Sequence, residues 1–152
     1  MKVKRKIFFI LFFLLFAIII FIILNFISKK EKEVFSQARI KGVVIDLEIA
    51  DSNYERYRGL SHRSGLAPYS GMLFLFPDKQ KRSFVMRDMN FSLDIVFIDE
   101  NRITDIYQNL PFAKDQQEIL YSSSVPVDKV LELPGNFCEE NNISISDLVE
   151  FF

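Results

Sequence analysis

Hydrophobic residues follow two different patterns along this chain. From Ile7 to Ile27 they form a run that only Asn25 interrupts. At about 1.5 Å per residue, a helix of this run would be roughly 30 Å long, which matches the hydrocarbon core of a bilayer. Beyond Val43, apolar and polar positions alternate in short segments bounded by Gly, Pro, Asn or Ser, as in strands. The pattern predicts one transmembrane helix followed by a mainly β domain.

The flanks of the apolar run predict an anchor that is not cleaved. A signal peptide has a shorter apolar region, typically about 7–15 residues, followed closely by a small-x-small site. Here Ser36-Gln37-Ala38 is small-x-small, but it lies beyond a Lys/Glu stretch. Basic residues are more numerous before the run, which favours a cytoplasmic N-terminus and an external domain. The predicted parts are a basic leader at 1–6, a transmembrane signal-anchor at 7–27, a linker at 28–39 and a β domain at 40–152. The predicted location is therefore the cell membrane, single-pass, with the domain on the extracytoplasmic side.

The domain after the anchor is predicted to contain several short strands and two short helices. Ser52 and Glu55 have the spacing of a capping box, which marks a helix start. The predicted strands are 43–49, 71–76, 83–86, 93–98, 102–107, 129–133 and 147–151, and the predicted helices are 53–60 and 137–141. Strands and helices do not alternate regularly, so a β sandwich or barrel-like domain is expected.

Asp94 interrupts the most apolar of these strands, Leu93–Ile98, which reads as buried on both faces. A buried carboxylate without a partner would be very costly. Asp94 is therefore expected to pair with a cation, with Arg58 and Arg87 the leading choices, or with several backbone N–H groups. The alternative is a surface carboxylate at a strand edge.

Composition and charge narrow the possible functions. Four of the nineteen Lys and Arg residues precede the apolar run and all twenty acids follow it, so the rest of the chain carries a net charge of about −5. This argues against nucleic acid, which requires a basic surface. The chain has one His, His62, and one Cys, Cys138. These numbers argue against a multi-His zinc site, a disulfide within the chain and repeated catalytic triads. No metal or cofactor is expected.

Two clusters of side chains could still carry binding chemistry. Three methionines and His62 could form a soft copper(I) site, although strand positions favour core packing for Met72 and Met86. Basic residues gather between positions 56 and 87, and arginine suits bidentate contacts with carboxylate or phosphate. They are Arg56, Arg58, Arg63, Lys79, Lys81, Arg82 and Arg87. The alternative is a solvated face with ordinary ion pairs.

Five blocks, in order, resemble the domain of unknown function 192 (DUF 192) family of bacteria and archaea. The blocks are Glu55-Arg-Tyr-Arg-Gly-Leu60 with Arg63 and Leu66, Gly71-Met-Leu-Phe-Leu-Phe-Pro77, Ser83-Phe-Val-Met-Arg-Asp-Met-Asn-Phe-Ser-Leu-Asp-Ile-Val-Phe-Ile-Asp99, Val130-Leu-Glu-Leu-Pro134 and Ile145-Ser-Asp-Leu-Val149. The resemblance covers about residues 40–152. It implies a compact, mostly β domain, often exported behind a signal segment, without an established activity. The chain departs from the family pattern at Ser61-His62 (usually Met-Phe), Val85 (Trp), Met89 (Thr), Ser92 (Pro) and Ser146 (Gly).

Three functions remain open at this point. The first is a non-catalytic module of the cell envelope that binds an unknown ligand or protein partner, with Arg58, Arg87, Asp94 and Arg63 as candidate binding residues. The second is an envelope hydrolase that uses two carboxylates, which would lie about 5–10 Å apart in an open cleft. The third is an envelope assembly scaffold, which a flat exposed apolar patch would favour.

Overall fold

The computed structural model describes residues 12–21, 35–112 and 119–152. Residues 12–21 form a helix with exposed side chains. Within the described ranges, no helix combines the length and hydrophobicity needed to cross a membrane. The predicted anchor at 7–27 lies mostly outside the described residues and stays a prediction. Residues 34–152 form a compact unit of their own.

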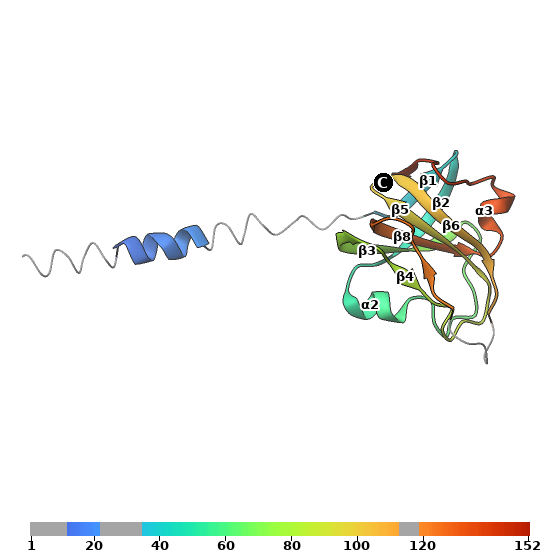
Figure 1. Ribbon diagram of the computed structural model, residues 1–152, viewed down its shortest axis with the longest axis horizontal. Coiled ribbons are helices and arrows are strands. Elements are labelled where there is room, and N and C mark those ends of the chain that lie inside the picture. The colour runs from blue at the N-terminus through green and yellow to red at the C-terminus, as the bar shows by residue number, and fades with distance from the viewer. Residues whose placement is uncertain (1–11, 22–34, 113–118) are drawn as a thin grey trace, which may run out of the picture. The chain divides into compact units, whose positions relative to one another are not determined.

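This unit is mainly β, with a seven-stranded sheet that curls into a half-barrel and a separate two-stranded sheet (Figure 1). The strand order in the large sheet is β6-β5-β8-β3-β2-β1-β9, and β4 pairs with β7. The strands are β1 (Gln37–Ile40), β2 (Val43–Ala50), β3 (Ser70–Gln80), β4 (Ser83–Phe84), β5 (Leu93–Asp99), β6 (Arg102–Leu110), β7 (Tyr121–Ser122), β8 (Val127–Pro134) and β9 (Val149–Phe151). The helices of this unit are α2 (Asn53–Arg58) and α3 (Phe137–Glu140).

One pair of neighbouring strands, β2 and β3, is parallel, and α2 lies in the connection between them. The capping box is confirmed, because the Ser52 side chain accepts from the Glu55 N–H and the Glu55 carboxylate accepts from the Ser52 N–H. Gly59 ends the helix at a φ of 49°, in the left-handed region that glycine tolerates. The parallel pair was not predicted, because strands and helices do not alternate regularly along the sequence as they do in parallel sheets.

Two apolar cores lie on the two faces of the large sheet, because side chains alternate along each strand. One core includes Leu73 and Leu131 and is covered by the α3 segment with Cys138. The other includes Phe74 and Val130 and is covered by Leu60, just after α2, and by neighbouring loops. The second core faces the site described below.

Most predicted elements are confirmed, and the differences have local causes. β1 begins at Gln37, inside the predicted linker. The sequence did not predict this strand, because four residues are too few to show an alternating pattern. β3 continues past Pro77 to Gln80, since a register shift between Leu75 and Gln80 accommodates the proline. β6 extends to Leu110, into the predicted loop.

Asp94 is fully buried and is held by three backbone N–H groups. Its Oδ1 accepts from the N–H of Asn109 at 2.7 Å and of Asn136 at 3.0 Å, and its Oδ2 accepts from the N–H of Cys138 at 2.7 Å. The prediction that several backbone N–H groups would satisfy Asp94 is therefore confirmed. The turn into α3 points its N–H groups at the carboxylate, which ties the chain after β8 to β5.

Candidate functional site

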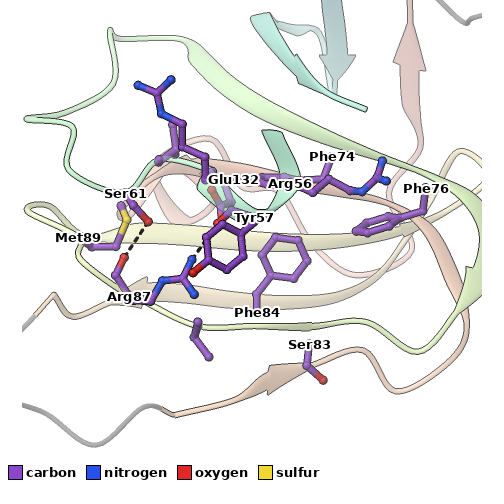
Figure 2. A pocket seen from close by; sticks show the side chains of 14 residues that line it. Arg56, Tyr57, Ser61, Phe74, Phe76, Ser83, Phe84, Arg87, Met89 and Glu132 are labelled. Atoms are coloured by element: carbon purple, nitrogen blue, oxygen red, sulfur yellow. Dashed lines mark hydrogen bonds between the residues drawn. The ribbon is translucent and has the colours of Figure 1, made fainter. Parts of the chain in front are cut away.

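A cavity of about 300 Å³ opens between the α2 segment, β3 and the strand β4 with the loop that follows it (Figure 2). Its walls combine aromatic rings, three arginines and one acid. The lining residues are Arg56, Tyr57, Arg58, Gly59, Leu60, Ser61, Phe74, Phe76, Ser83, Phe84, Val85, Arg87, Met89 and Glu132. Ligand sites in proteins usually have this character, with a mostly apolar lining and a few polar groups.

The aromatic wall is part of a continuous series of edge-to-face contacts. The rings of Phe74 and Phe84 lie 4.9 Å apart at 87°, and Phe84 meets Phe97 at 6.0 Å. The series continues through Tyr107 to Tyr121 on the two-stranded sheet. Such edge-to-face contacts stabilise the positions of the rings that form the wall of the cavity.

Glu132 is the buried acid of the cavity. It lies on β8 between Met72 and Ile95, two residues of the second core, and is only 5% exposed. Its Oε2 has no hydrogen-bond partner among the described residues. Burial raises the pKa of this carboxyl to about 8, although the charge of Arg63 acts in the opposite direction. Glu132 is therefore mainly uncharged at neutral pH.

Arg63 does not neutralise Glu132 because it is already paired. Its two terminal nitrogens each donate to one oxygen of Glu48 at 2.7 Å, in a bidentate contact. The hydrogen bond from Arg63 lowers the pKa of Glu48, and the same pair raises the pKa of Arg63. Arg63, a predicted binding residue, thus forms an ion pair and is not among the residues that line the cavity.

Arg87 is fixed in place at the solvent side of the cavity. Its guanidinium lies 4.3 Å from the ring centre of Tyr57 and donates to the Tyr57 carbonyl at 2.8 Å (Figure 2). The hydroxyl of Ser61 donates to the Arg87 carbonyl at 3.0 Å. The Arg87 Nε lies 3.9 Å from the exposed carboxylate of Asp88, and about a third of the Arg87 side chain remains exposed, so one part of this positioned cation meets solvent.

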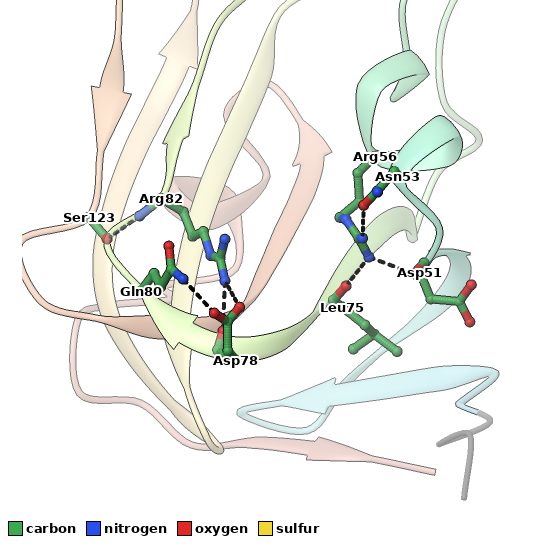
Figure 3. Close-up of polar contacts among 8 residues, drawn as sticks. All are labelled: Asp51, Asn53, Arg56, Leu75, Asp78, Gln80, Arg82 and Ser123. Carbon is green, nitrogen blue, oxygen red and sulfur yellow. Dashed lines mark hydrogen bonds and ion pairs between the residues drawn. The ribbon is translucent and has the colours of Figure 1, made fainter. Parts of the chain in front are cut away.

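Arg56 is held by the protein on the other side of the cavity (Figure 3). One terminal nitrogen donates to the carbonyls of Asp51 and Leu75, and the other donates to the Asn53 side chain at 2.7 Å. Its guanidinium also lies 5.4 Å from the centre of the Phe76 ring. These contacts use most of its donors, so Arg56 positions the middle of β3 relative to α2.

Arg82 supports the same aromatic ring from a neighbouring position. Its guanidinium lies 4.0 Å from the Phe76 ring centre. The guanidinium also donates to the Asp78 carboxylate at 2.6 Å, and the backbone N–H of Arg82 donates to Ser123 (Figure 3). Phe76 therefore contacts two guanidinium groups. This arrangement fixes the outer part of the aromatic wall.

Arg58 differs from the other arginines of the cavity. It is exposed, and its side chain makes no hydrogen bond or ion pair with any described residue. With Arg56 and Arg87 it gives the lining three positive charges, whereas Glu132 is mainly uncharged at neutral pH. The lining of the cavity therefore carries a net positive charge, although the chain as a whole is slightly acidic.

The structure brings together two of the four predicted binding residues. Arg58 and Arg87 line the same cavity. Ile95 belongs to the core on the cavity side of the sheet, and Asp94, the preceding residue on β5, therefore points to the opposite face. The two arginines were also the leading predicted partners of Asp94, and that pairing is wrong because Asp94 already accepts three N–H groups. Within the described residues, no cluster of three or more His, Cys, Asp or Glu side chains could hold a metal.

Sequence reasoning did not single out Glu132, although the signal was present. Glu132 interrupts the apolar strand Val130–Leu133 in the same way that Asp94 interrupts Leu93–Ile98. A carboxylate in the middle of a strand that is buried on both faces needs either a partner or a function. The structure gives Asp94 its partners and leaves Oε2 of Glu132 without one.

Comparison with protein families matches residues 36–151, more than half of the chain, to DUF192, described as an uncharacterized ACR. The chain belongs to the DUF192 family. Two solved structures are similar to this DUF192 domain, and both have a TM-score of 0.70. One is a protein of unknown function from Novosphingobium aromaticivorans DSM 12444, with 26% identity over 81% of this chain and 89% of that chain. The other, from Sinorhizobium meliloti 1021, is described as a proposed transcription regulator, with 28% identity over 79% of this chain and 98% of that chain. Comparison with curated proteins found no match.

Proposed function

We propose that this DUF192 domain is a non-catalytic module that binds a small ligand in its aromatic cavity, on the extracytoplasmic side of a membrane. The anchor would be the apolar run at 7–27, which is long enough to span a bilayer as a helix. The binding part of the proposal is supported by the composition of the cavity, which combines aromatic walls with a few polar groups.

The observation that carries the proposal is the unpartnered Oε2 of Glu132. A buried polar atom without a hydrogen bond destabilises the folded state by about 1–3 kcal/mol. Such atoms are rare in native structures and each requires an explanation. A ligand in the cavity would reach Glu132, which forms part of the lining, and would supply the missing hydrogen bond.

The carboxylate-dependent hydrolase is less well supported by the same lining. Glycoside hydrolysis of this type needs two carboxylates, separated by about 5–10 Å across the site. Among the residues that line the cavity in the described part of the chain, Glu132 is the one acid. A single, buried and uncharged acid suits a hydrogen bond to a bound ligand better than two-carboxylate chemistry.

Filling the cavity tests the binding proposal. Val85 lines the cavity, so Val85→Trp should occupy it, while Val125→Trp adds the same side chain at an exposed position outside it. The full chain in detergent micelles is screened by ligand-observed NMR against fragments of positive, negative and zero charge. Fragments should bind the wild type and Val125→Trp but lose binding to Val85→Trp. Equal signals for all three proteins would reject the cavity as a binding site.

The membrane part of the proposal needs a separate test. Protease added to intact spheroplasts should digest the chain beyond residue 35 and leave a membrane-bound fragment that retains Met1. Cleavage after Ala38 would remove half of β1 and a fully buried side chain, which supports an uncleaved segment. A mature N-terminus at Arg39 would overturn the anchor, and full protection of the domain would overturn its orientation.

A further inference from the structure

The cavity has a polarity that restricts the chemistry of its ligand, provided that it is a ligand site as proposed above. Its deepest polar group is Glu132, which is 5% exposed. Its solvent side carries Arg58 and Arg87. The rings of Phe74 and Phe84 are also part of the lining. A ligand that satisfies all three parts must differ in chemistry from one end to the other.

We propose that the cavity takes a small anionic molecule built on a ring. Its carboxylate or phosphate group contacts Arg58 and Arg87, its ring packs against Phe74 and Phe84, and a hydroxyl or carbonyl at its far end hydrogen-bonds to Glu132. The arginines select the negative charge, since Arg58 has no ion-pair partner among the described residues and Arg87 has only a long contact, 3.9 Å, with the exposed carboxylate of Asp88.

Arg58 provides the sharpest evidence for the anionic end. The guanidinium groups of Arg56 and Arg87 are already bound to backbone carbonyls, whereas Arg58 has all of its donors available among the described residues. A guanidinium can hold a carboxylate or phosphate through two parallel hydrogen bonds. Arg87, fixed on Tyr57 with one face exposed, adds a second cation whose position needs no further ordering.

Three probes of similar size separate charge from shape at pH 7. They are 4-hydroxybenzoate, which is anionic, 4-hydroxybenzyl alcohol, which is neutral, and 4-hydroxybenzylamine, which is cationic. Each is titrated into the full chain in micelles labelled with ¹³C at the methionine methyl groups, and the signal of Met89, a buried lining residue, is followed. The same titrations of Val85→Trp measure binding to the micelle alone.

We expect 4-hydroxybenzoate to bind with a Kd on the order of 1 mM, which is typical of a ligand with about ten non-hydrogen atoms. The neutral probe should bind about fivefold more weakly, and the cationic probe about tenfold more weakly or not at all. Benzoate, which lacks the distal hydroxyl, should also bind about fivefold more weakly than 4-hydroxybenzoate, because it leaves Glu132 without a partner.

Substitutions locate the anionic end. Arg58→Gln should weaken 4-hydroxybenzoate about fivefold and leave the neutral probe unchanged. Arg102→Gln removes the same charge far from the cavity, at the cost of one surface hydrogen bond to Ser146, and should change neither probe. Equal effects of the two substitutions would overturn the assignment of Arg58.

The outcomes also separate this inference from the proposed function. Binding of the neutral or cationic probe as tight as that of the anion would overturn the anionic class while leaving a ligand cavity in place. If none of the probes moves the Met89 signal of the wild type more than that of Val85→Trp at about 10 mM, the anionic assignment fails. The proposed function fails with it only if the broader fragment screen also finds nothing.

Discussion

The replacement of Glu132 by Gln offers the sharpest test of the cavity's electrostatics. Glutamine has nearly the same shape but cannot ionise, so the two proteins should differ in how their stability depends on pH. Folding raises the pKa of Glu132 from its ordinary 4.5 to about 8. The folded chain therefore holds a proton that the unfolded chain releases between these two values.

The sign of the effect follows from this difference in bound protons. Between pH 4.5 and pH 8 the folded state binds more protons than the unfolded state, so stability falls as pH rises. The proton on Glu132 stabilises the folded state. This contribution to the free energy of unfolding is fully present below pH 4.5 and is lost as pH rises through the folded pKa of about 8. At 1.36 kcal/mol per pH unit, the wild type should lose about 3–4 kcal/mol relative to Glu132→Gln between pH 5 and pH 8.

Urea unfolding of both proteins at pH 5, 6, 7 and 8 measures this change, with the full chain in a non-ionic detergent. The quantity of interest is the difference in unfolding free energy between the wild type and Glu132→Gln, since other titrating groups cancel in it. Glu55→Gln is the matched control, because the backbone N–H of Ser52 donates to the Glu55 carboxylate and lowers its pKa, away from Arg63 and Glu132. The difference between the wild type and that control should stay nearly constant over the same range.

One result would refute the reasoning. If the difference between the wild type and Glu132→Gln changes by less than about 0.5 kcal/mol from pH 5 to pH 8, Glu132 ionises in the folded state near its ordinary pKa. Water or an unrecognised cation would then solvate Oε2, and the unpartnered carboxyl would no longer support a ligand site.

Three further substitutions or reactions test the structural contacts. Asp94→Ala should lower the free energy of unfolding by about 3–5 kcal/mol, because it leaves buried N–H groups unpaired, and an unchanged urea midpoint would contradict this. Ser52→Ala should cost about 1 kcal/mol through loss of the helix cap, seen as a small midpoint shift of the same transition. The Cys138 thiol, whose pKa is raised by burial and by Asp94, should react with maleimide only in urea; fast reaction in buffer would show that its segment opens.

Local signals predicted much of the fold. The strand Leu93–Ile98 and the capping box at Ser52 each depend on residues that are neighbours in the sequence. Their patterns can therefore be recognised from the sequence alone. β7 could not be predicted, because two residues carry no period and Tyr121 is placed by its ladder with β4. The parallel pairing of β2 with β3 was also missed, since it results from a crossover and leaves no periodic trace.

The candidate site was predicted only in part for a related reason. Arg58 and Arg87 were chosen for their charge and positions, and the fold does bring both to one cavity. Arg63 was chosen on the same grounds, but tertiary structure places it opposite Glu48. Strands that are distant in sequence decide whether an arginine side chain faces an acidic partner or a cavity. Composition and residue spacing do not reveal how such strands are arranged.

The pairing of β1 with β9 has a consequence for how the chain reaches its folded state. Arg39 and Glu150 lie opposite each other in this pair, 111 positions apart, and form an ion pair of 2.8 Å. During synthesis, β1 emerges before β9, so the edge of β1 that pairs with β9 stays unpaired until the end of the chain is made. Contacts between such distant residues form slowly, and an unpaired edge can recruit a strand from another molecule. The domain is therefore most prone to self-association in the interval before Val149–Phe151 docks, and a chaperone that covers β1 would act during that interval.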